Sequence, residues 1–296
     1  MRVIYGENRR LLAKQLRNEI DAHHAGRPYS RGFLLVPEQQ KAGLERQYFA
    51  EDSSRSLMLE EVLSFRRFAL RLAELGGGAG RKSMSAGLQS FYLGRIMAEE
   101  SSRLQAFGKA ILRPSFLTMI SEVIGDFLRY EIQPGQLREA AEAARRDGEP
   151  RFAERISDYA VILEAYLRKM RTAEALPGDL VLGDLAARLE RLEERLIEVN
   201  QDWSRLTFPW NQYEFLRGSS IWIHGFGISR SLTPQESRIT AVLHRLCHEV
   251  VLTTECERVP TSLADAAKGP AHFRPGRQLL WSLQEKFGAR VESVGG

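Results

Sequence analysis

Residues 221–226 have the sequence Ile-Trp-Ile-His-Gly-Phe (IWIHGF), and Thr233-Pro234-Gln235-Glu236 (TPQE) follows them. An apolar run of this length, ended by a glycine, predicts a buried β-strand over 220–226. The pattern after it predicts a helix over 234–247. A buried strand that leads into a helix is the repeating unit of a parallel α/β sheet.

The same alternation occurs at both ends of the chain. Strands are predicted at 2–5, 33–36, 249–254 and 290–292, and a further one at 61–63, after Leu57-Met58-Leu59. Helices are predicted at 8–20, 39–49 and 276–287, with another that follows Phe65 and ends near Leu75, because apolar residues recur there at helical spacing. The fold class indicated is α/β with a parallel sheet.

The middle of the chain is different. After Gly76-Gly77-Gly78-Ala79-Gly80, helical periodicity extends from Ser85 to about Asn200, with starts at Ser85 and Pro114 and breaks at Pro134-Gly135 and Pro177-Gly178. Three apolar stripes are predicted to pack between helices: Phe116, Ile120, Val123, Ile124, Phe127 and Leu128; Phe152, Ile156, Tyr159, Leu163, Tyr166 and Met170; and Leu185, Leu189, Leu192 and Leu196. A sheet that is begun, interrupted and resumed indicates a helical insertion into one α/β domain.

Composition bounds the class of protein. The chain has 296 residues, of which 43% are hydrophobic, which is enough to bury a core. It contains no apolar run of membrane-spanning length and no secretory signal at its start, so a cytoplasmic protein without a membrane partner is expected. Cys247 and Cys256 are too few for a disulfide framework or a four-cysteine iron-sulfur site.

The net charge of +4 comes from an excess of arginine. Arginine forks match phosphate geometry and stack on bases, so nucleic acid is a plausible partner. The alternative is that these arginines lie on solvated helix faces and form ion pairs with the 38 acidic residues.

Four segments carry a family resemblance. They are LLVPEQ at 34–39, EVLSFRRFA at 61–69, IWIHGF with TPQE, and HFRPGRQLL at 272–280. In this order they resemble the B subunit of bacterial AddAB-type (RexAB) helicase-nucleases. The resemblance implies a RecA-like (P-loop NTPase-type) domain at 1–80 and 216–296, with a helical insertion at 81–215 as in superfamily-one helicases. It also implies that the chain is a fragment, the N-terminal helicase-like portion of a longer protein.

The family implies a role in processing double-strand DNA ends for recombinational repair. Its partners would be DNA, single-stranded or at a duplex end, and an A-type subunit in a heterodimer that carries the active helicase. The family's iron-sulfur cluster and magnesium would belong to a nuclease domain beyond this chain. No cofactor, metal or catalytic residue is therefore expected in this segment, and recognition of a hotspot sequence in DNA is one role that the resemblance suggests.

Departures from the family pattern concern the nucleotide site. Nucleotide-binding members have a GxxxxGK(S/T) loop after the first strand, whose amides and lysine hold phosphates. Here Gly6 is followed by Glu7, Asn8, Arg9 and Arg10, and Lys14 stands two residues past the lysine position. His224 replaces the acid often found at the equivalent strand tip, where magnesium needs a carboxylate oxygen. Gly6, Glu7, Arg9, Arg10 and His224 are thus predicted to form a degenerate nucleotide site without ATP hydrolysis. The alternative is a rearranged loop that binds ATP through Arg9, Arg10 or Lys14.

DNA-binding candidates follow the second and third strands, at carboxyl ends where open α/β sheets bind ligands. They are Glu38, Gln39, Ser64, Phe65, Arg66 and Arg67, to which Gln235 of the TPQE segment is added. Hydroxyl, amide and arginine groups suit phosphates, and Phe65 could stack on a base, although it also falls on the apolar face of its helix. A third possibility is a protein-interaction module whose arginines bind an acidic partner.

Metal binding by His244, Cys247, His248 and Cys256 is not expected, because their spacing matches no standard zinc pattern. The histidines are instead expected to complement the dipole at a helix C-terminus. His224 is expected to be a neutral side chain that fills the former metal position.

Overall fold

The computed structural model describes residues 1–27, 29–50, 60–76, 82–107, 114–173, 175–228 and 230–294. The chain divides into two compact units. The sheet unit comprises Met1–Ala79 and Leu185–Gly296, and the helical unit comprises Gly80–Asp184. Each unit is described by itself.

The sheet unit is built on a six-stranded sheet in which every pairing is parallel, with the order β3-β2-β6-β7-β1-β8. The strands are β1 (Arg2–Gly6), β2 (Gly32–Leu35), β3 (Glu60–Leu63), β6 (Ser220–Ile223), β7 (Glu249–Glu255) and β8 (Arg290–Ser293). Strands from the two ends of the chain are neighbours, since β6 pairs with β2 and β7 pairs with β1. The predicted parallel α/β sheet is therefore confirmed.

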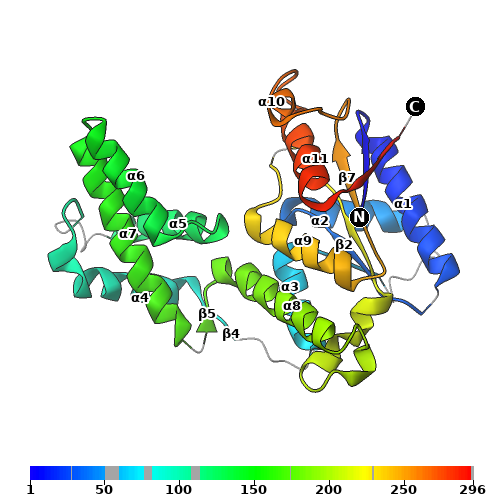
Figure 1. Cartoon of the computed structure of the whole chain (residues 1–296), viewed down its shortest axis with the longest axis horizontal. Coiled ribbons are helices and arrows are strands. Elements are labelled where there is room, and N and C mark those ends of the chain that lie inside the picture. The colour runs from blue at the N-terminus through cyan, green and yellow to red at the C-terminus, as the bar shows by residue number, and fades with distance from the viewer. Residues whose placement is uncertain are drawn as a thin grey trace. The chain divides into compact units, whose positions relative to one another are not determined.

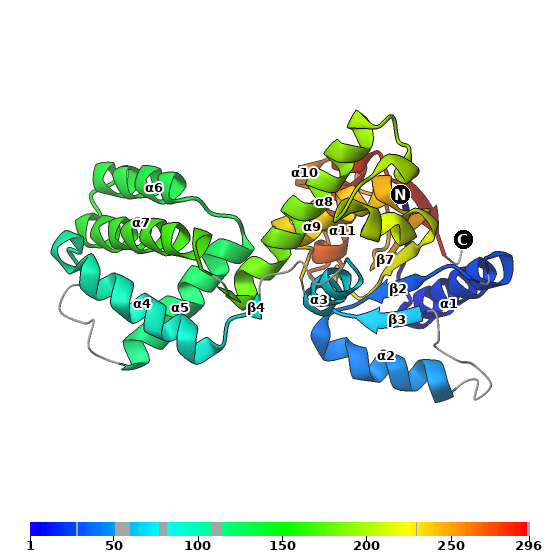
Figure 2. The same cartoon turned by 90° about the horizontal axis from the view of Figure 1, so that it is seen from below.

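Helices cover both faces of this sheet. On one face lie α1 (Arg9–Gly26) and α2 (Glu38–Ala50); on the other lie α3 (Phe65–Leu75), α9 (Pro234–Leu246) and α11 (Arg274–Phe287), as Figure 2 shows. Alternate strand residues point to opposite faces, so both layers are apolar. The α1 face buries Ile4, Leu12, Leu16, Ile20, Leu34, Val36, Val62, Trp222 and Val251. The remaining short elements are α10 (Leu263–Ala266), η3 (Trp203–Arg205) and η4 (Trp210–Gly218).

Side-chain caps explain where three of these helices begin. Asn8 accepts hydrogen bonds from the first turn of α1, and Ser64 accepts one from the Arg67 amide at the start of α3. Thr233 and Glu236 form a reciprocal capping box at α9. The predicted start of α9 at Pro234 is confirmed.

The predicted strand over 220–226 is too long, because β6 ends at Ile223. The His224 amide still donates a hydrogen bond to the Leu35 carbonyl oxygen of β2, and the chain then turns at Gly225 and Gly227, whose φ values are +84° and +86°. Such left-handed conformations favour glycine and end a strand. Leu57, Met58 and Leu59, expected to lead into the third strand, lie outside the described residues.

The helical unit consists mainly of α4 (Ala86–Glu99), α5 (Pro114–Arg129), α6 (Pro134–Arg146) and α7 (Pro150–Arg171), and α6 and α7 lie side by side (Figure 1). Short segments β4 (Lys82–Ser83) and β5 (Ala175–Leu176) pair in parallel, which joins the start of the unit to its end. The first two apolar stripes pack into one core, apart from Val123 of the first and Phe152 of the second. Phe152 is 47% exposed, and the Arg155 guanidinium lies over its ring.

One buried carboxylate stabilises the segment around η1 (Ser101–Arg103) of the helical unit. Asp158 of α7 is 1% exposed, and it accepts hydrogen bonds of 2.8 Å from three successive backbone amides, those of Gln105, Ala106 and Phe107. These charge-assisted bonds compensate for removing the carboxylate from water.

The division between the units falls within α8 (Val181–Glu198), after the short helix η2 (Gly178–Leu180). The predicted insertion, 81–215, extends further than the helical unit, because the residues from Leu185 onward group with the sheet. Glu190 and Glu193 of α8 form ion pairs with Arg238 and Arg245 of α9, respectively. The third apolar stripe, which consists of four leucines of α8, is also buried. An amphipathic stripe identifies a helix but not the surface that it covers.

Among the described residues, no helix is long and apolar enough to cross a membrane.

Candidate functional site

The candidate site lies at the carboxyl edge of the sheet, where β1, β7, β6 and β2 end. The connection from β1 to α1 consists of Glu7 and Asn8 alone. The Asn8 side-chain oxygen accepts hydrogen bonds from the backbone amides of Arg10 at 2.9 Å and Leu11 at 3.3 Å. Amides at a helix start are the groups that a phosphate loop offers to its ligand, and here the protein's own side chain occupies them.

Gly6, which matched the first glycine of the phosphate-loop pattern, is closely packed. A Cβ atom at this position would lie 3.1 Å from the Val294 carbonyl oxygen, beyond the end of the neighbouring β8. Its own carbonyl accepts a hydrogen bond from the Cys256 amide. Glu7, Arg9, Arg10 and Lys14 are exposed.

His224 is 3% exposed at the end of β6, and its Nδ1 lies 2.6 Å from Oγ1 of Thr253 on β7. Burial, with a smaller effect of the nearby Arg9 charge, lowers the pKa of His224 to about 4. The imidazole is therefore neutral at pH 7, and its hydrogen bond to the threonine satisfies one ring nitrogen.

Arg9 contacts one residue of α2 and the last residue of β7. Its Nη2 donates to Oε1 of Gln40 at 2.9 Å, and its Nε lies 3.8 Å from Oε1 of Glu255, the last residue of β7. The Gln40 amide donates in turn to the Gly225 carbonyl oxygen at 3.5 Å. A cation and its polar partners thus lie at the carboxyl edge of the sheet, beside the end of β7.

The start of α11 packs closely against the same edge. A Cβ atom at Gly276 would lie 1.9 Å from the Glu255 carbonyl oxygen, and one at Gly227 would lie 2.2 Å from Oγ1 of Thr254. Arg277 is fully buried, pairs with Glu257, and donates to the Ala266 and Pro270 carbonyl oxygens. This guanidinium connects the segment after β7 to α11.

The candidate metal ligands of the described residues do not form a cluster. Within the described ranges, no group of three or more His, Cys, Asp or Glu side chains could hold a metal ion. The histidine-cysteine group makes other contacts: His244 lies within 2.9 Å of the Met1 amino group, and Cys256 Sγ donates to the Arg258 carbonyl oxygen at 2.7 Å. Burial raises the pKa of the Cys247 thiol, which disfavours the thiolate that binds metals.

A second cluster forms where β2 and β3 end. Arg67 Nε donates to Oε1 of Glu38 at 2.9 Å, and both side chains are more than half exposed. A hydrogen bond from Ser64, together with Arg67, lowers the pKa of Glu38. Gln39 and Arg66 are also exposed. The structure therefore brings together three of the predicted DNA contacts, Glu38, Ser64 and Arg67, with the carboxylate already bound to one arginine.

Two predicted DNA contacts need correction. The Phe65 ring is 2% exposed and packs edge-on against Phe226 at 5.6 Å, so it is not available to stack on a base. Gln235 is also 2% exposed, in the first turn of α9. Both positions follow strands in the sequence, but their side chains point into the core.

Sequence reasoning missed Gln40, Thr253, Glu255 and Arg277. The polar end of the predicted strand at 249–254 was a usable signal, since Thr253, Thr254 and Glu255 follow an apolar run. The partners could not be identified, because strand order was unknown.

Comparison with known proteins places this architecture in a family. The family described as "ADDB, N-terminal" matches residues 4–179. The chain is similar to the B subunit of the ATP-dependent helicase/deoxyribonuclease of Desulfitobacterium hafniense, with 24% identity over 95% of the chain, and to that of Pelotomaculum thermopropionicum, with 29% identity over 94%. The protein of the same description from Oceanobacillus iheyensis is 25% identical over 92% of the chain.

These matches cover 20% of the Desulfitobacterium protein and 22% of each of the other two, so the chain spans about a fifth of the length of these relatives. The match at 4–179 includes the first part of the sheet unit and most of the helical unit. The chain therefore belongs to the AddB N-terminal family.

Proposed function

We propose that this chain is a helicase-like segment of a helicase-nuclease subunit that does not hydrolyse ATP and acts by binding DNA. In this proposal the sheet is RecA-like, with its parts at 1–80 and 216–296 and a helical insertion at 81–215. The observation that supports the proposal is at the carboxyl edge of the sheet, where Asn8 caps the α1 amides, Arg9 contacts Gln40, and His224 is hydrogen-bonded to Thr253.

Phosphoryl transfer from ATP depends on positioned phosphates and a bound metal ion. The α1 amides are bonded to Asn8, and the strand tip bears a neutral imidazole in place of an anionic oxygen. Restoring either group alone would not complete the site, because both are needed for the reaction. The two losses support the same conclusion independently.

DNA binding would use the exposed arginines at the ends of β2 and β3. Arg66 and Arg67 lie at the start of α3 beside Ser64, and their guanidinium groups suit phosphate oxygens. The relatives are named as B subunits of an ATP-dependent helicase/deoxyribonuclease, which supports a role as part of such a complex acting on DNA. Repair of double-strand breaks, together with an A-type subunit and in the cytoplasm, is the role that we propose. Recognition of a hotspot sequence is the finer form of this role. The family's iron-sulfur cluster and magnesium would act outside this chain.

Nucleotide titration tests the first half of the proposal. A fluorescent ATP analogue, added with magnesium, should show no saturable binding to the chain. A dissociation constant in the micromolar range would contradict the proposal and favour the rearranged-loop alternative. In that case, Arg9→Ala, Arg10→Ala and Lys14→Ala variants would identify the cation responsible, and Arg195→Ala, on the exposed face of α8, is the control.

DNA titration tests the second half. Fluorescence anisotropy of a labelled single-stranded oligonucleotide should report binding that weakens steeply as salt is added, because phosphate contacts release counterions. Absent binding, or binding that does not respond to salt, would favour the protein-interaction module instead.

A further inference from the structure

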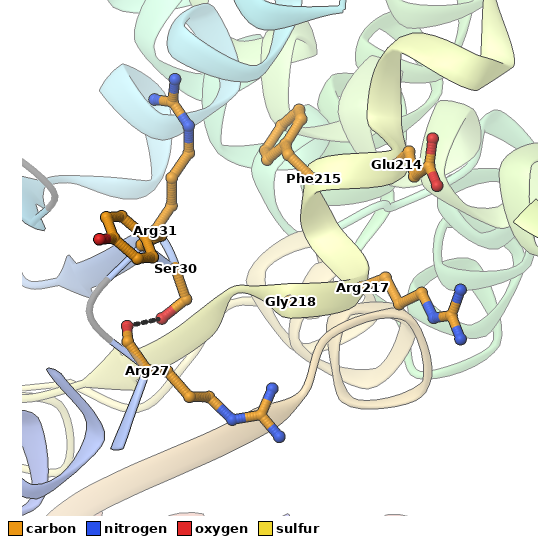
Figure 3. Close-up of a pocket in the computed structure, with 8 residues that line it drawn as sticks. Arg27, Ser30, Arg31, Glu214, Phe215, Arg217 and Gly218 are labelled. Atoms are coloured by element: carbon orange, nitrogen blue, oxygen red, sulfur yellow. Dashed lines mark hydrogen bonds between the residues drawn. The ribbon is translucent and has the colours of Figure 1, made fainter. Parts of the chain in front are cut away.

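An open pocket of about 430 Å³ lies at the amino edge of the sheet, where β2 and β6 begin. It is formed by the connection from α1 to β2 and by the end of η4, and the residues that determine its chemistry are Arg27, Tyr29, Arg31, Glu214, Phe215 and Arg217 (Figure 3). All of them belong to the sheet unit. Neither the candidate nucleotide site nor the predicted DNA contacts include any of these residues.

Three arginines face one carboxylate in this pocket, so its charge is positive. Arg31 is already engaged: its guanidinium lies 5.8 Å from the centre of the Phe215 ring, and its Nη1 lies 3.8 Å from Oε1 of Glu61. Arg27 and Arg217 are exposed, and in Figure 3 their guanidinium groups point away from Arg31 and Phe215. Among the residues that the structure describes, neither guanidinium makes a hydrogen bond or an ion pair.

Aromatic groups stand beside these cations. Tyr29 is 93% exposed, which is unusual for a large ring that would gain free energy from burial. Phe215 is half-buried and contributes to the opposite wall of the pocket. A base has two apolar faces that can stack on such rings, whatever its identity.

The connection that carries Arg27 and Tyr29 is held in place from within. The Ser30 hydroxyl lies 2.8 Å from the Arg27 carbonyl oxygen and 2.6 Å from Nε2 of His23 on α1. His23 Nδ1 lies 3.0 Å from the hydroxyl of Ser220, the first residue of β6. This chain of hydrogen bonds reduces the ordering that a ligand would have to impose.

We propose that this pocket binds a nucleotide unit of single-stranded nucleic acid, with its phosphate on Arg27 and Arg217 and its base on Tyr29 or Phe215. The inference rests on the proposed DNA-binding function and adds a second contact region at the opposite edge of the sheet. The pocket is too open and too charged for an enclosed small apolar ligand, and its rings suit bases better than the carboxylates of an acidic protein.

Binding of a fluorescein-labelled oligothymidylate to the whole chain tests the pocket. For Arg27→Ala with Arg217→Ala, the slope of log affinity against log salt should flatten by about 0.7 units, since the one phosphate that both arginines would hold contributes about 0.7 on a single strand. The matched control is Arg195→Ala with Arg290→Ala, which removes the same charge from exposed positions on α8 and β8 and should leave the slope within error.

Tyr29 supplies an independent readout. Tyr29→Ala should weaken binding by at least about fivefold, whereas Tyr29→Phe should retain it, because stacking needs the ring and not the hydroxyl. Photocrosslinking of an iodouracil oligonucleotide to the unmodified chain should label Tyr29 or Phe215. If the arginine variant fails to fold by circular dichroism, Arg27→Lys with Arg217→Lys should keep the salt slope, and the tyrosine and crosslinking results decide the matter.

The outcomes separate this inference from the proposed function. In one outcome, binding stays steeply salt-dependent and unchanged in the Arg27/Arg217 and Tyr29 variants, with crosslinks at other residues. That result would contradict nucleotide binding in this pocket and leave the proposed function intact. No binding of the unmodified chain would overturn both. If polyglutamate displaces the oligonucleotide as well as unlabelled oligothymidylate does, the pocket recognises acidic surfaces and the nucleotide assignment is wrong.

Discussion

The two edges of the six-stranded sheet differ in the contacts that their arginine and histidine side chains make. At the carboxyl edge, Arg9 contacts Gln40 and Glu255, and His224 is bonded to Thr253. At the amino edge, between the starts of β2 and β6, Arg27 and Arg217 border an open pocket. Parallel sheets ordinarily bind ligands at the carboxyl edge. In this protein Arg9 and His224 at that edge contact neighbouring side chains, and exposed positive charge also lies at the other edge.

The amino edge is not open along its whole length. Where β1, β7 and β8 begin, Arg2 forms ion pairs with Glu19, Glu249 and Glu292 at distances between 2.8 and 3.0 Å. The contrast is therefore local: cations near β1 have carboxylate partners, whereas those near β2 and β6 line a pocket. An anionic ligand would therefore break fewer existing ion pairs near the starts of β2 and β6 than near the start of β1.

The largest expected effect comes from disturbing the tight packing of the carboxyl edge. Gly276→Ala should destabilise the chain by about 3 kcal/mol, the upper range for overpacking, because the new Cβ would meet the Glu255 backbone oxygen. The matched change at the open edge is Gly218→Ala, where a Cβ meets nothing within 4 Å and stability should be nearly unchanged. Urea unfolding measures both, and equal midpoints would refute the contrast between the edges.

A pH series compares one histidine from each edge. Burial lowers the pKa of His224 to about 4, and burial with the neighbouring His24 charge lowers that of His23 to about 4. Because these folded pKa values lie below the ordinary value near 6.5, the unfolded chain binds protons more readily. Stability is complete above about pH 6.5 and falls as the pH drops toward about 4.

For the buried His224, this loss between about pH 7 and about pH 5 should amount to about 2 kcal/mol. His224→Gln should remove that part of the pH dependence in urea unfolding. His23→Gln should remove less, because His23 is only half-buried and more screened by solvent. An unchanged pH profile in His224→Gln would show that the imidazole is not held neutral by the fold.

DNA binding at the carboxyl edge is tested by Arg66→Ala with Arg67→Ala. If both side chains contact phosphates, the salt slope should flatten by about one to two units, with the larger value for duplex DNA. The charge-matched variant Arg195→Ala with Arg290→Ala should not change it. A salt slope identical to that of the unmodified chain would show that Arg66 and Arg67 are solvated surface groups that do not contact DNA phosphates.

The smallest expected effect concerns the ion pair that Arg67 already makes. Glu38→Gln removes the negative charge that DNA would have to displace, so affinity for single-stranded DNA should rise about twofold to fivefold and the salt slope should steepen by about 0.7. Stability should change by less than about 1 kcal/mol, since the pair is exposed. Weaker DNA binding in this variant would mean that Glu38 itself supports the contact.

Much of the fold could be predicted from local patterns. Apolar runs bounded by glycine located the strands, and Ser85, Pro114 and Pro234 marked helix starts that are confirmed. The end of β6 was misplaced, because His224 and Phe226 are buried as strand residues would be but lie on either side of a turn at Gly225. Burial alone does not distinguish a strand from the buried segment that leaves it.

Part of the candidate site could also be predicted. The short connection after Gly6 and the missing carboxylate at His224 were visible in the residues themselves. The orientation of Phe65 and Gln235 was not, because residues at strand ends point either to the ligand or to the core, and neighbouring rings such as Phe226 decide between the two.

The sequence by itself determined the alternation of strand and helix, the helical middle, and the chemical groups absent from the first and sixth strand ends. Only the tertiary structure decided which groups replace them. Arg9, Gln40, His224 and Glu255 are distant along the chain and meet because parallel strands align their carboxyl ends at one edge of the sheet. The pocket around Arg27 and Arg217 has the same origin at the opposite edge, since contacts between strands depend on their order in the sheet and not on their order in the chain.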